Sequence, residues 1–484
     1  MSYNNRFKIF ASLLIIGLVG GALFFLLNLY RPGIIPISIG GQDQERRQQG
    51  YRPNIILISI DTLRADHLGC YGYYRNTTPN IDRLAEDGVL FANTIAQSTW
   101  TLPSHMSIFT GLYVSSHGII SDDKKLGDEH ITLAEVLQDA GYETVAFTEG
   151  GYVSEKFGYQ GFDHFEGRAK GEKEIDIKII YTKAVDWLKK APSRPFFLFL
   201  HTYQPHSPYN PPPAFDIYSD KNYQGIVDVS APEIVGNDLY YYQSIQSQMT
   251  LDDYLYVIDK YDGEIHYTDH YLGKLFNALK DLGLYDESII IFTSDHGENF
   301  LDHPDSGISY IGHYEMYDEV VKVPLIIKAP GFPKNKIIDT QVESIDIMPT
   351  VLGLLKINIT SRVEGESLVG LVKKGLYDEV FAFSERSLGR KREFSEYRMI
   401  RSNDWKLLLR SKEESGMLEL ELYNLKVDPK EQNNLHTEEV EVGKSMFAKL
   451  QTWMNRHKGK SKPADKIKLD DDLKKQLKDL GYIN

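Results

Sequence analysis

The chain of 484 residues contains one cysteine, Cys70. A single thiol cannot form an intrachain disulfide, so a fold held together by disulfides and a redox enzyme with paired cysteines are excluded. A zinc site built from several cysteines is excluded for the same reason. Basic residues are also fewer than acidic ones. The chain has 54 Lys and Arg and 68 Asp and Glu, so its formal net charge is −14. Nucleic-acid binding requires clustered Lys and Arg, so the acidic balance argues against a nucleic-acid partner.

The overall composition is that of an ordinary globular protein. Hydrophobic residues make up 42% and charged residues 25% of the chain, which is unlike a disordered segment. At about 150 residues per domain, the length predicts two or three domains, or one large domain with an appendage.

A long uncharged run lies near the N-terminus, from Ile9 to Tyr30. It has about 22 residues, enough to cross a ~30 Å hydrocarbon core as one helix. A cleaved signal peptide would have a shorter apolar region and a small-residue cleavage site, whereas Tyr30, Arg31 and Pro32 follow here. The run predicts an uncleaved membrane anchor over residues 1–30 with a flexible linker over residues 31–52. Basic residues flank both ends of the run, so charge counting leaves its orientation open.

Strand-like and helix-like patterns alternate beyond the linker. The β-branched run Asn54 to Ile60 predicts a strand that is buried on both faces. Further strands are expected at 143–147, 196–200, 288–293 and 323–328, and helices at 131–140, 174–190, 259–282 and 344–355. This alternation predicts a mostly parallel sheet covered by helices, within a domain of residues 53–375.

Three other segments depart from this alternation. Residues 208–252 are rich in Pro, Tyr and Asp and are interpreted as a long insertion over one face of the domain. Short strands followed by a helix, from Val380 to Arg456, predict a small antiparallel α+β domain of residues 376–457. Residues 458–484 are mostly Lys and Asp and are interpreted as a solvated tail or a frayed helix.

Two predicted strands end in residues that commonly bind metals. The first ends at Asp61 and the second at Ser294-Asp295-His296-Gly297-Glu298. Ligands of open α/β sheets bind at the carboxyl ends of the strands, so Asp61, Asp295 and His296 are candidates to converge on one divalent cation. The alternative is that these residues merely form turns, in which Asp is common.

A hydroxyl group marks the start of a third predicted element. Pro103 suits a first helical turn and Gly111 a helix end, so Thr101 lies at the amino end of a short predicted helix. The helix dipole there favours an anion or an alkoxide forming on Thr101, which becomes a competent nucleophile when a metal lowers its pKa. The alternative is that Thr101 simply caps the helix.

Several short motifs occur in order along the body of the chain. They are Ile60 to Gly69, Thr78 to Asp82, Thr101 to His105, Thr110-Gly111, Pro205 to Tyr209, Ser294 to Glu298, Gly312 to Glu319, Val323 to Leu325, Leu422 to Leu425, Asp428-Pro429 and Asn434-Leu435. In kind and order they resemble the sulfatase family within the alkaline phosphatase superfamily, from about Asn54 to Leu435. The resemblance implies a three-layer α/β/α sandwich (alkaline phosphatase-like) with a small C-terminal antiparallel α+β domain, which agrees with the alternation described above.

The resemblance also implies roles for individual residues. Asp61, Asp295 and His296 match the family's metal ligands, and Thr101 falls where the family places its nucleophile, which also touches the metal. His206 matches a His near the transferred group, with a role in shaping its loop as the alternative. His313 falls where many members have a Lys that meets the leaving oxygen, with a surface histidine as the alternative. The ligand set implies one divalent cation and does not choose between Ca, Mg, Mn and Zn.

Departures from the family pattern bear on the reaction. Sulfatases use a formylglycine made from Cys or Ser, but this chain has Thr101 at that position, and oxidation of Thr would give a ketone rather than an aldehyde. Thr62 replaces one of the family's paired Asp ligands, and Phe147 to Gly151 replaces a stretch that supplies two cations. Asp262 and His266 are interpreted as an ordinary surface pair rather than as ligands of a second metal.

We therefore expect a metal-dependent hydrolase that cleaves anionic sulfate or phosphate esters through Thr101. The alternatives are a membrane-anchored phosphodiesterase or phosphotransferase, since those branches of the superfamily resemble this chain in using Thr, and a non-catalytic binding protein on the sulfatase fold. We expect a single-pass membrane protein that contacts the membrane through its N-terminal helix, with an extracytoplasmic catalytic domain.

Overall fold

The computed structural model describes residues 52–168, 176–192, 194–229, 244–303, 311–358, 361–375, 380–387, 396–412, 416–459 and 464–479. The predicted membrane anchor, residues 1–30, and the predicted linker up to residue 51 lie outside these residues. Across the described ranges, we find no helix with both the length and the apolar character needed to span a bilayer.

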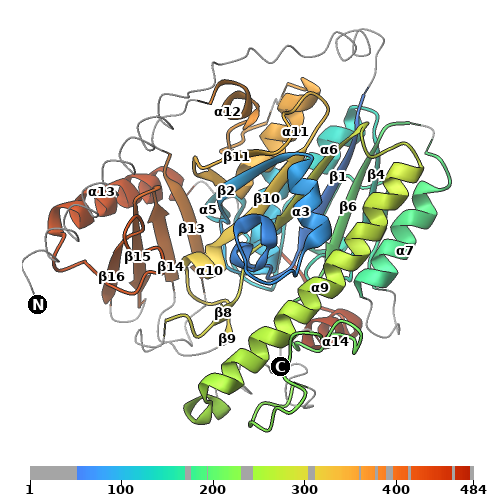
Figure 1. Ribbon diagram of the computed structural model, residues 1–484. Coiled ribbons are helices and arrows are strands. Elements are labelled where there is room, and N and C mark those ends of the chain that lie inside the picture. Colours follow the sequence, from blue (N-terminus) through green and yellow to red (C-terminus); the bar gives the residue numbers. More distant parts are fainter. Residues whose placement is uncertain are drawn as a thin grey trace, which may run out of the picture. The chain divides into compact units, whose positions relative to one another are not determined.

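A nine-stranded sheet forms the centre of the larger part of the molecule (Figure 1). Its strand order is β11-β2-β10-β7-β1-β6-β4-β5, and β12 pairs with β2. The strands are β1 (Asn54–Ile60), β2 (Val89–Ile95), β4 (Glu143–Phe147), β5 (His164–Glu166), β6 (Phe196–Thr202), β7 (Ser288–Ser294), β10 (Lys322–Lys328), β11 (Lys336–Ile338) and β12 (Val342–Glu343). The pairings are parallel except that β10 runs antiparallel to both β2 and β7. The predicted mostly parallel sheet is therefore confirmed.

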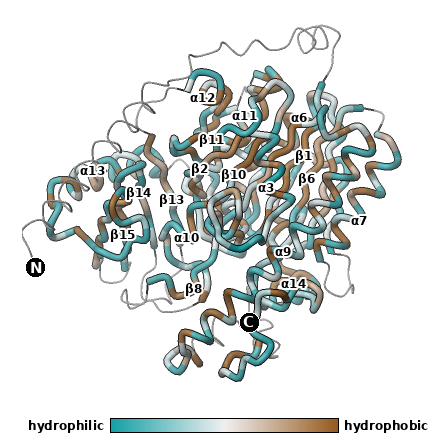
Figure 2. The backbone as a smooth tube through the Cα atoms, viewed as in Figure 1, coloured by the Kyte–Doolittle hydropathy of each residue, from teal (hydrophilic) through white to brown (hydrophobic). Residues whose placement is uncertain are grey.

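Helices cover both faces of this sheet because the central strands are apolar on both sides. Along β1, Ile55 and Leu57 belong to one hydrophobic cluster, whereas Ile56 and Ile58 belong to another on the opposite face. The first face packs against α4 (Thr101–Thr110), α6 (Leu133–Asp139), α11 (Ile347–Leu355) and α12 (Val369–Lys374), and the second against α3 (Pro79–Glu86), α7 (Ile177–Leu188) and α9 (Leu251–Asp281). Figure 2 shows hydrophobic residues concentrated along the central strands. The three-layer α/β/α sandwich predicted from the sequence is confirmed.

Helix α9 begins earlier than the sequence pattern indicates. Residues 208–229 contain no helix or strand, as expected for the predicted insertion, but α9 starts at Leu251 rather than Asp259. Thr250 caps this helix, since its side chain accepts a hydrogen bond from Asp253 N and the Asp253 carboxylate accepts one from Thr250 N. This reciprocal cap starts the helix within a stretch that has weak hydrophobic periodicity.

A second, four-stranded antiparallel sheet follows in the chain. Its strands are β13 (Ala382–Ser387), β14 (Glu396–Arg401), β15 (Trp405–Ser411) and β16 (Leu418–Asn424). Helix α13 (Val440–His457) packs on it, with Leu450 and Trp453 in one cluster with Ile400 and Leu407. The predicted antiparallel α+β unit is therefore present.

The C-terminal segment corrects the prediction of a solvated tail. Strand β17 (Asp465–Lys466) pairs with β3 (Lys124–Lys125), and helix α14 (Asp471–Asp479) buries Leu473 and Leu477 in the main core. The leucines lie four residues apart and so share one helix face, while the Lys and Asp residues occupy the other faces. The prediction considered only the many charged residues of this segment and therefore missed the apolar stripe.

Candidate active site

The register of the central strands brings the predicted metal ligands together. Ile60 of β1 pairs with Ser294 of β7 in parallel, so Asp61 and Asp295 follow directly at the same edge of the sheet. The Ser294 hydroxyl accepts a hydrogen bond from Leu63 N at 3.1 Å and donates one to His296 O at 2.6 Å. Ser294 thereby connects the two loops that carry the predicted ligands.

The three ligand atoms form a compact, buried set. His296 Nε2 lies 3.3 Å from Asp61 Oδ1 and 3.5 Å from Asp295 Oδ2, and all three side chains are fully buried. Within the described residues, Asp295 Oδ2 and His296 Nε2 make no hydrogen bond. Burial raises the pKa of Asp295 to about 7 and lowers that of His296 well below its ordinary value. Two carboxylate oxygens and a neutral imidazole nitrogen therefore fit a divalent cation, which would compensate for the loss of water around them.

Thr101 is the first residue of α4 and does not cap it. The N-cap position is Trp100, whose backbone is extended and whose side chain makes no capping hydrogen bond. One turn later, His105 Nδ1 donates a hydrogen bond to Thr101 O at 2.9 Å and lies 3.6 Å from Asp295 Oδ2, while its Nε2 meets Ser59 Oγ at 3.0 Å. Burial lowers the pKa of His105 to about 4, so the ring is neutral near pH 7. The first turn of α4 is thus fixed against the ends of β1 and β7.

The two predicted catalytic histidines lie close to each other and near His296 of the ligand set. The ring of His313 is 4.4 Å from that of His296, and the ring of His206 is 5.7 Å from that of His313. His313 Nδ1 donates to Thr99 O at 2.8 Å, and His206 Nδ1 donates to Ser207 O at 2.8 Å. Both side chains are buried, so His313 is not a surface histidine. Burial, assisted by nearby His296 and Arg386, holds the pKa of His313 well below its ordinary value.

Arg386 is a site residue that the sequence reasoning missed. It lies on β13 of the small sheet, and its Nη1 donates to Thr99 O at 3.0 Å, to Thr99 Oγ1 at 2.7 Å and to His313 O. Arg386 therefore holds the segment before Thr101 beside the segment that carries His313. The sequence reasoning assigned no arginine or lysine to the site, whereas the fold adds this guanidinium. No motif spacing marks it, because 285 residues separate Arg386 from Thr101.

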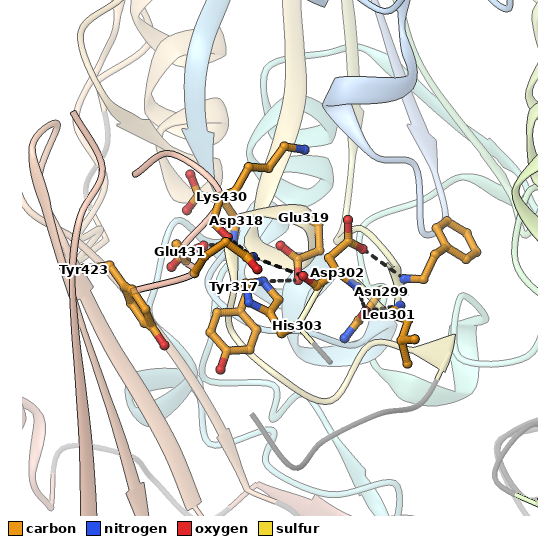
Figure 3. A network of polar contacts seen from close by, with 12 residues as sticks. Asn299, Leu301, Asp302, His303, Tyr317, Asp318, Glu319, Tyr423, Lys430 and Glu431 are labelled. Carbon is orange, nitrogen blue, oxygen red and sulfur yellow. Dashed lines mark hydrogen bonds and ion pairs between the residues drawn. The ribbon is translucent and has the colours of Figure 1, made fainter. Parts of the chain in front are cut away.

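A buried polar network links the loop that follows His296 to the small sheet (Figure 3). Gly297 N donates to Val320 O at 2.7 Å, and His303 Nε2 lies 3.0 Å from Glu319 Oε1. Burial alone would lower the pKa of His303, but the Glu319 carboxylate outweighs burial and raises it. From the small domain, Glu431 Oε2 accepts a hydrogen bond from Asp318 N at 2.6 Å.

Asp262 and His266 do not form the surface pair that the sequence suggested. Asp262 is fully buried and receives His67 Nδ1, the Tyr73 hydroxyl and Arg75 Nη1, each at 2.7 Å. His266 Nδ1 instead meets Thr77 O at 3.1 Å. Tertiary contacts override the helical spacing here, and both residues of α9 hold the loop that follows Asp61.

Comparison with known proteins relates this geometry to a family. A family model described as Sulfatase matches residues 53–357, and one described as N-sulphoglucosamine sulphohydrolase, C-terminal, matches residues 309–459. An arylsulfatase from Clostridium perfringens is 28% identical over 451 residues, covering 79% of this chain and 90% of that protein. An N-acetylglucosamine-6-O-sulfatase from Bacteroides thetaiotaomicron is 24% identical over 508 residues, covering 86% and 87%.

Solved structures share the fold. A protein in complex with its substrate D-glucosamine-2-N,6-O-disulfate superposes with a TM-score of 0.70 at 23% identity, covering 84% of this chain and 98% of that one. The phosphonate monoester hydrolase of Agrobacterium radiobacter gives a TM-score of 0.67 at 22% identity, with 84% and 96% covered. At these identities the structural likeness concerns the fold alone.

Proposed function

The chain belongs to the sulfatase family, and from that premise we propose that it is a metal-dependent hydrolase that uses Thr101 to cleave sulfate or phosphate esters. Its relatives include named sulfatases, and the chain is therefore an ester hydrolase of the sulfatase and alkaline phosphatase superfamily. The observation that carries the proposal is the meeting of the Thr101 helix with the buried set Asp61, Asp295 and His296. Sulfate esters are the first candidate substrates, because the relatives carry sulfatase names.

Asp61, Asp295 and His296 would hold one divalent cation, and Thr101 would supply the hydroxyl that attacks the substrate. When bound, such a cation supplies charge that polarises the ester group and lowers the pKa of a neighbouring hydroxyl. The donor set of two carboxylates and one imidazole accepts Ca, Mg, Mn or Zn, so the metal is not specified by its ligands.

The residues of this chain account for the two halves of the reaction. Thr101 Oγ1 attacks sulfur or phosphorus, the bond to the leaving oxygen breaks, and its electron pair goes to that oxygen. His313 Nδ1 donates a hydrogen bond to Thr99 O, so its Nε2 lone pair is available to take the Thr101 proton and pass it to the leaving oxygen. Water then attacks the sulfur or phosphorus of the Thr101 ester and gives a proton to His313 Nε2. The bond to Thr101 Oγ1 breaks, Thr101 takes up that proton, and sulfate or phosphate is released. His206 would act on the transferred group from its position beside His313.

A phosphate ester or diester is the second candidate, favoured by Thr101 itself. A Thr cannot be converted to formylglycine, so this chain cannot form the usual sulfatase nucleophile at position 101. One structural neighbour is a phosphonate monoester hydrolase. A transferase would use an acceptor alcohol in place of water in the second half of the reaction.

The decisive experiment assays the purified full chain on aryl sulfate, aryl phosphate and aryl phosphodiester substrates, with and without added divalent cations. Metal-dependent turnover of one class, abolished in Thr101→Ala, supports the proposal and selects the substrate. Absence of both bound metal and turnover in all three assays would instead favour a non-catalytic binding protein on the same fold.

We also propose that residues 1–30 anchor the protein in a membrane with the catalytic domain on the extracytoplasmic side. The uncharged run from Ile9 to Tyr30 supports this proposal. Protease added to intact cells should digest the catalytic domain, and alkaline carbonate should leave the chain in the membrane fraction. Protection until the cells are permeabilised would contradict the orientation, and release by carbonate would contradict the anchor.

A further inference from the structure

The C-terminal helix α14 contacts a tight turn, Gly150 to Val153, which is closed by a hydrogen bond from Val153 N to Gly150 O at 3.0 Å. Gln476 of α14 is 8% exposed, and its Oε1 accepts a hydrogen bond from Gly151 N at 3.1 Å. Its Nε2 donates to Asp472 Oδ2 at 3.1 Å, one helical turn earlier, which fixes the orientation of the amide. Gln476 therefore pairs with a buried backbone N–H that would be costly to leave unpaired.

Two adjacent glycines allow α14 to approach this turn closely. Gly150 and Gly151 have φ angles of 83° and 58°, in the left-handed region that favours glycine. A Cβ atom at Gly150 would lie 2.6 Å from Gln476 Oε1, so a side chain there would displace Gln476. These glycines end the stretch Phe147 to Gly151, which stands where the family resemblance places a stretch that supplies two cations. In this chain, a glycine turn that contacts α14 takes the place of those charged side chains.

The turn packs against the residue that precedes the proposed nucleophile. The rings of Tyr152 and Trp100 meet edge to face, with their centroids 5.5 Å apart. Trp100 is the N-cap residue of α4 and is followed directly by Thr101. Leu473 and Leu477 of α14 belong to the same hydrophobic cluster as these two rings. A shift of the turn is therefore passed to the start of α4, because closely packed side chains transmit displacement.

The turn also holds the segment that leads to His206. Tyr152 N donates to the Tyr203 hydroxyl at 2.9 Å, and this hydroxyl donates to Gly150 O at 3.3 Å. The Tyr203 ring lies 6.4 Å from the ring of His206, and His206 N donates to Tyr203 O. One turn thus contacts the neighbours of both Thr101 and His206.

We propose that Gln476 is a positioning residue for the reaction, and that α14 supports the active site through the turn Gly150 to Val153. Gln476 touches no reacting atom. It fixes the turn, which in turn fixes Trp100 before Thr101 and Tyr203 before His206. The inference rests on the proposed function, because the roles of Thr101 and His206 belong to that function.

The variant Gln476→Met in the full chain tests this, because Met keeps the unbranched length of the side chain and removes the amide oxygen. We expect kcat on the best aryl ester to fall about tenfold while KM stays within about twofold, since a displaced nucleophile slows the reaction more than it weakens binding. Gln476→Glu should keep kcat within about twofold of wild type, because a carboxylate oxygen accepts the same hydrogen bond from Gly151 N.

Hydrogen–deuterium exchange supplies a readout that does not depend on activity. The amides of residues 150–153 and of the first turn of α4 should exchange faster in Gln476→Met than in wild type, and at the wild-type rate in Gln476→Glu. The matched control is Asp470→Ala. Asp470 Oδ1 accepts a hydrogen bond from Leu473 N at 2.8 Å at the start of α14, so its loss should speed exchange within α14 and leave kcat and the turn unchanged.

This inference and the proposed function fail in different ways. If wild type turns over an aryl ester but Gln476→Met matches Asp470→Ala in both kcat and exchange at residues 150–153, the positioning role is wrong and the proposed function stands. Loss of kcat in Gln476→Glu equal to that in Gln476→Met would also overturn the role of the hydrogen bond to Gly151. If wild type turns over no aryl ester, the proposed function fails, and the catalytic consequence assigned to Gln476 fails with it.

Discussion

Replacement of Thr101 by Ala tests the proposed nucleophile directly, because the expected loss of activity is much larger than the expected loss of stability. Loss of the attacking oxygen should lower kcat about 10⁴-fold or more, equivalent to about 5–6 kcal/mol of barrier. The structural cost is smaller. Thr101 is buried, so removing its methyl and hydroxyl groups costs about 1–2 kcal/mol of stability. No capping energy is lost, since Trp100 occupies the N-cap position.

The assay compares kcat on the best aryl ester with the midpoint of thermal unfolding by circular dichroism. Thr101→Ser keeps the hydroxyl and should retain activity within about tenfold, with a stability loss of about 1 kcal/mol for the missing methyl. Thr110→Ala, at the other end of the same helix, is the matched control. Thr110 is buried and donates to Met106 O at 2.6 Å, so its loss should destabilise the fold as much and leave kcat unchanged. A folded Thr101→Ala variant with more than a tenth of wild-type turnover would refute the assignment.

Three further predictions concern other parts of the structure. Arg386→Gln should lower kcat/KM about 10- to 100-fold by releasing the segments of Thr99 and His313 from each other; unchanged kinetics would show that this guanidinium does not position them. Leu473→Ala should lower the free energy of unfolding, measured with denaturant, by about 2–5 kcal/mol, because α14 buries this leucine in the main core. A decrease of less than about 0.5 kcal/mol would instead support the solvated tail predicted from the sequence. For His303, the pKa is raised in the folded state, so its stabilising effect is full below the ordinary value of 6.5 and is lost as pH rises through the folded pKa. His303→Gln should therefore destabilise more at about pH 5.5 than at about pH 8.5, and an equal loss at both pH values would contradict the ion pair with Glu319.

Local patterns in the sequence were sufficient for most of the fold. The run Asn54 to Ile60 and its counterparts predicted strands of the sheet because burial on both faces demands continuous apolar residues. The direction of individual strands and the exact start of helices were harder to predict. β10 runs antiparallel to its neighbours, and α9 starts at Leu251 because of a reciprocal cap, features that no periodicity reveals.

The candidate site also contains both residues that could be predicted from the sequence and residues that could not. Asp61, Asp295 and His296 could be proposed as ligands because each follows a recognisable strand, and the carboxyl ends of neighbouring parallel strands meet at one edge. Arg386 could not be proposed, because it lies on a strand of a different sheet, and only packing brings it to Thr99 and His313. Asp262 was misread for a related reason: helical spacing gives its face but not what that face packs against.

The sequence by itself determined the α/β sandwich, the small antiparallel sheet and the family, and the family resemblance assigns Thr101 to the position where a formylglycine would be made. These properties depend on residue identity and on spacing along the chain, which short-range backbone geometry converts into helices, strands and motifs. Tertiary structure alone decided the burial of α14, the orientation of His105 beneath Thr101, and the approach of Arg386 to the site. Those depend on contacts between residues far apart in the chain, which form only when whole layers pack.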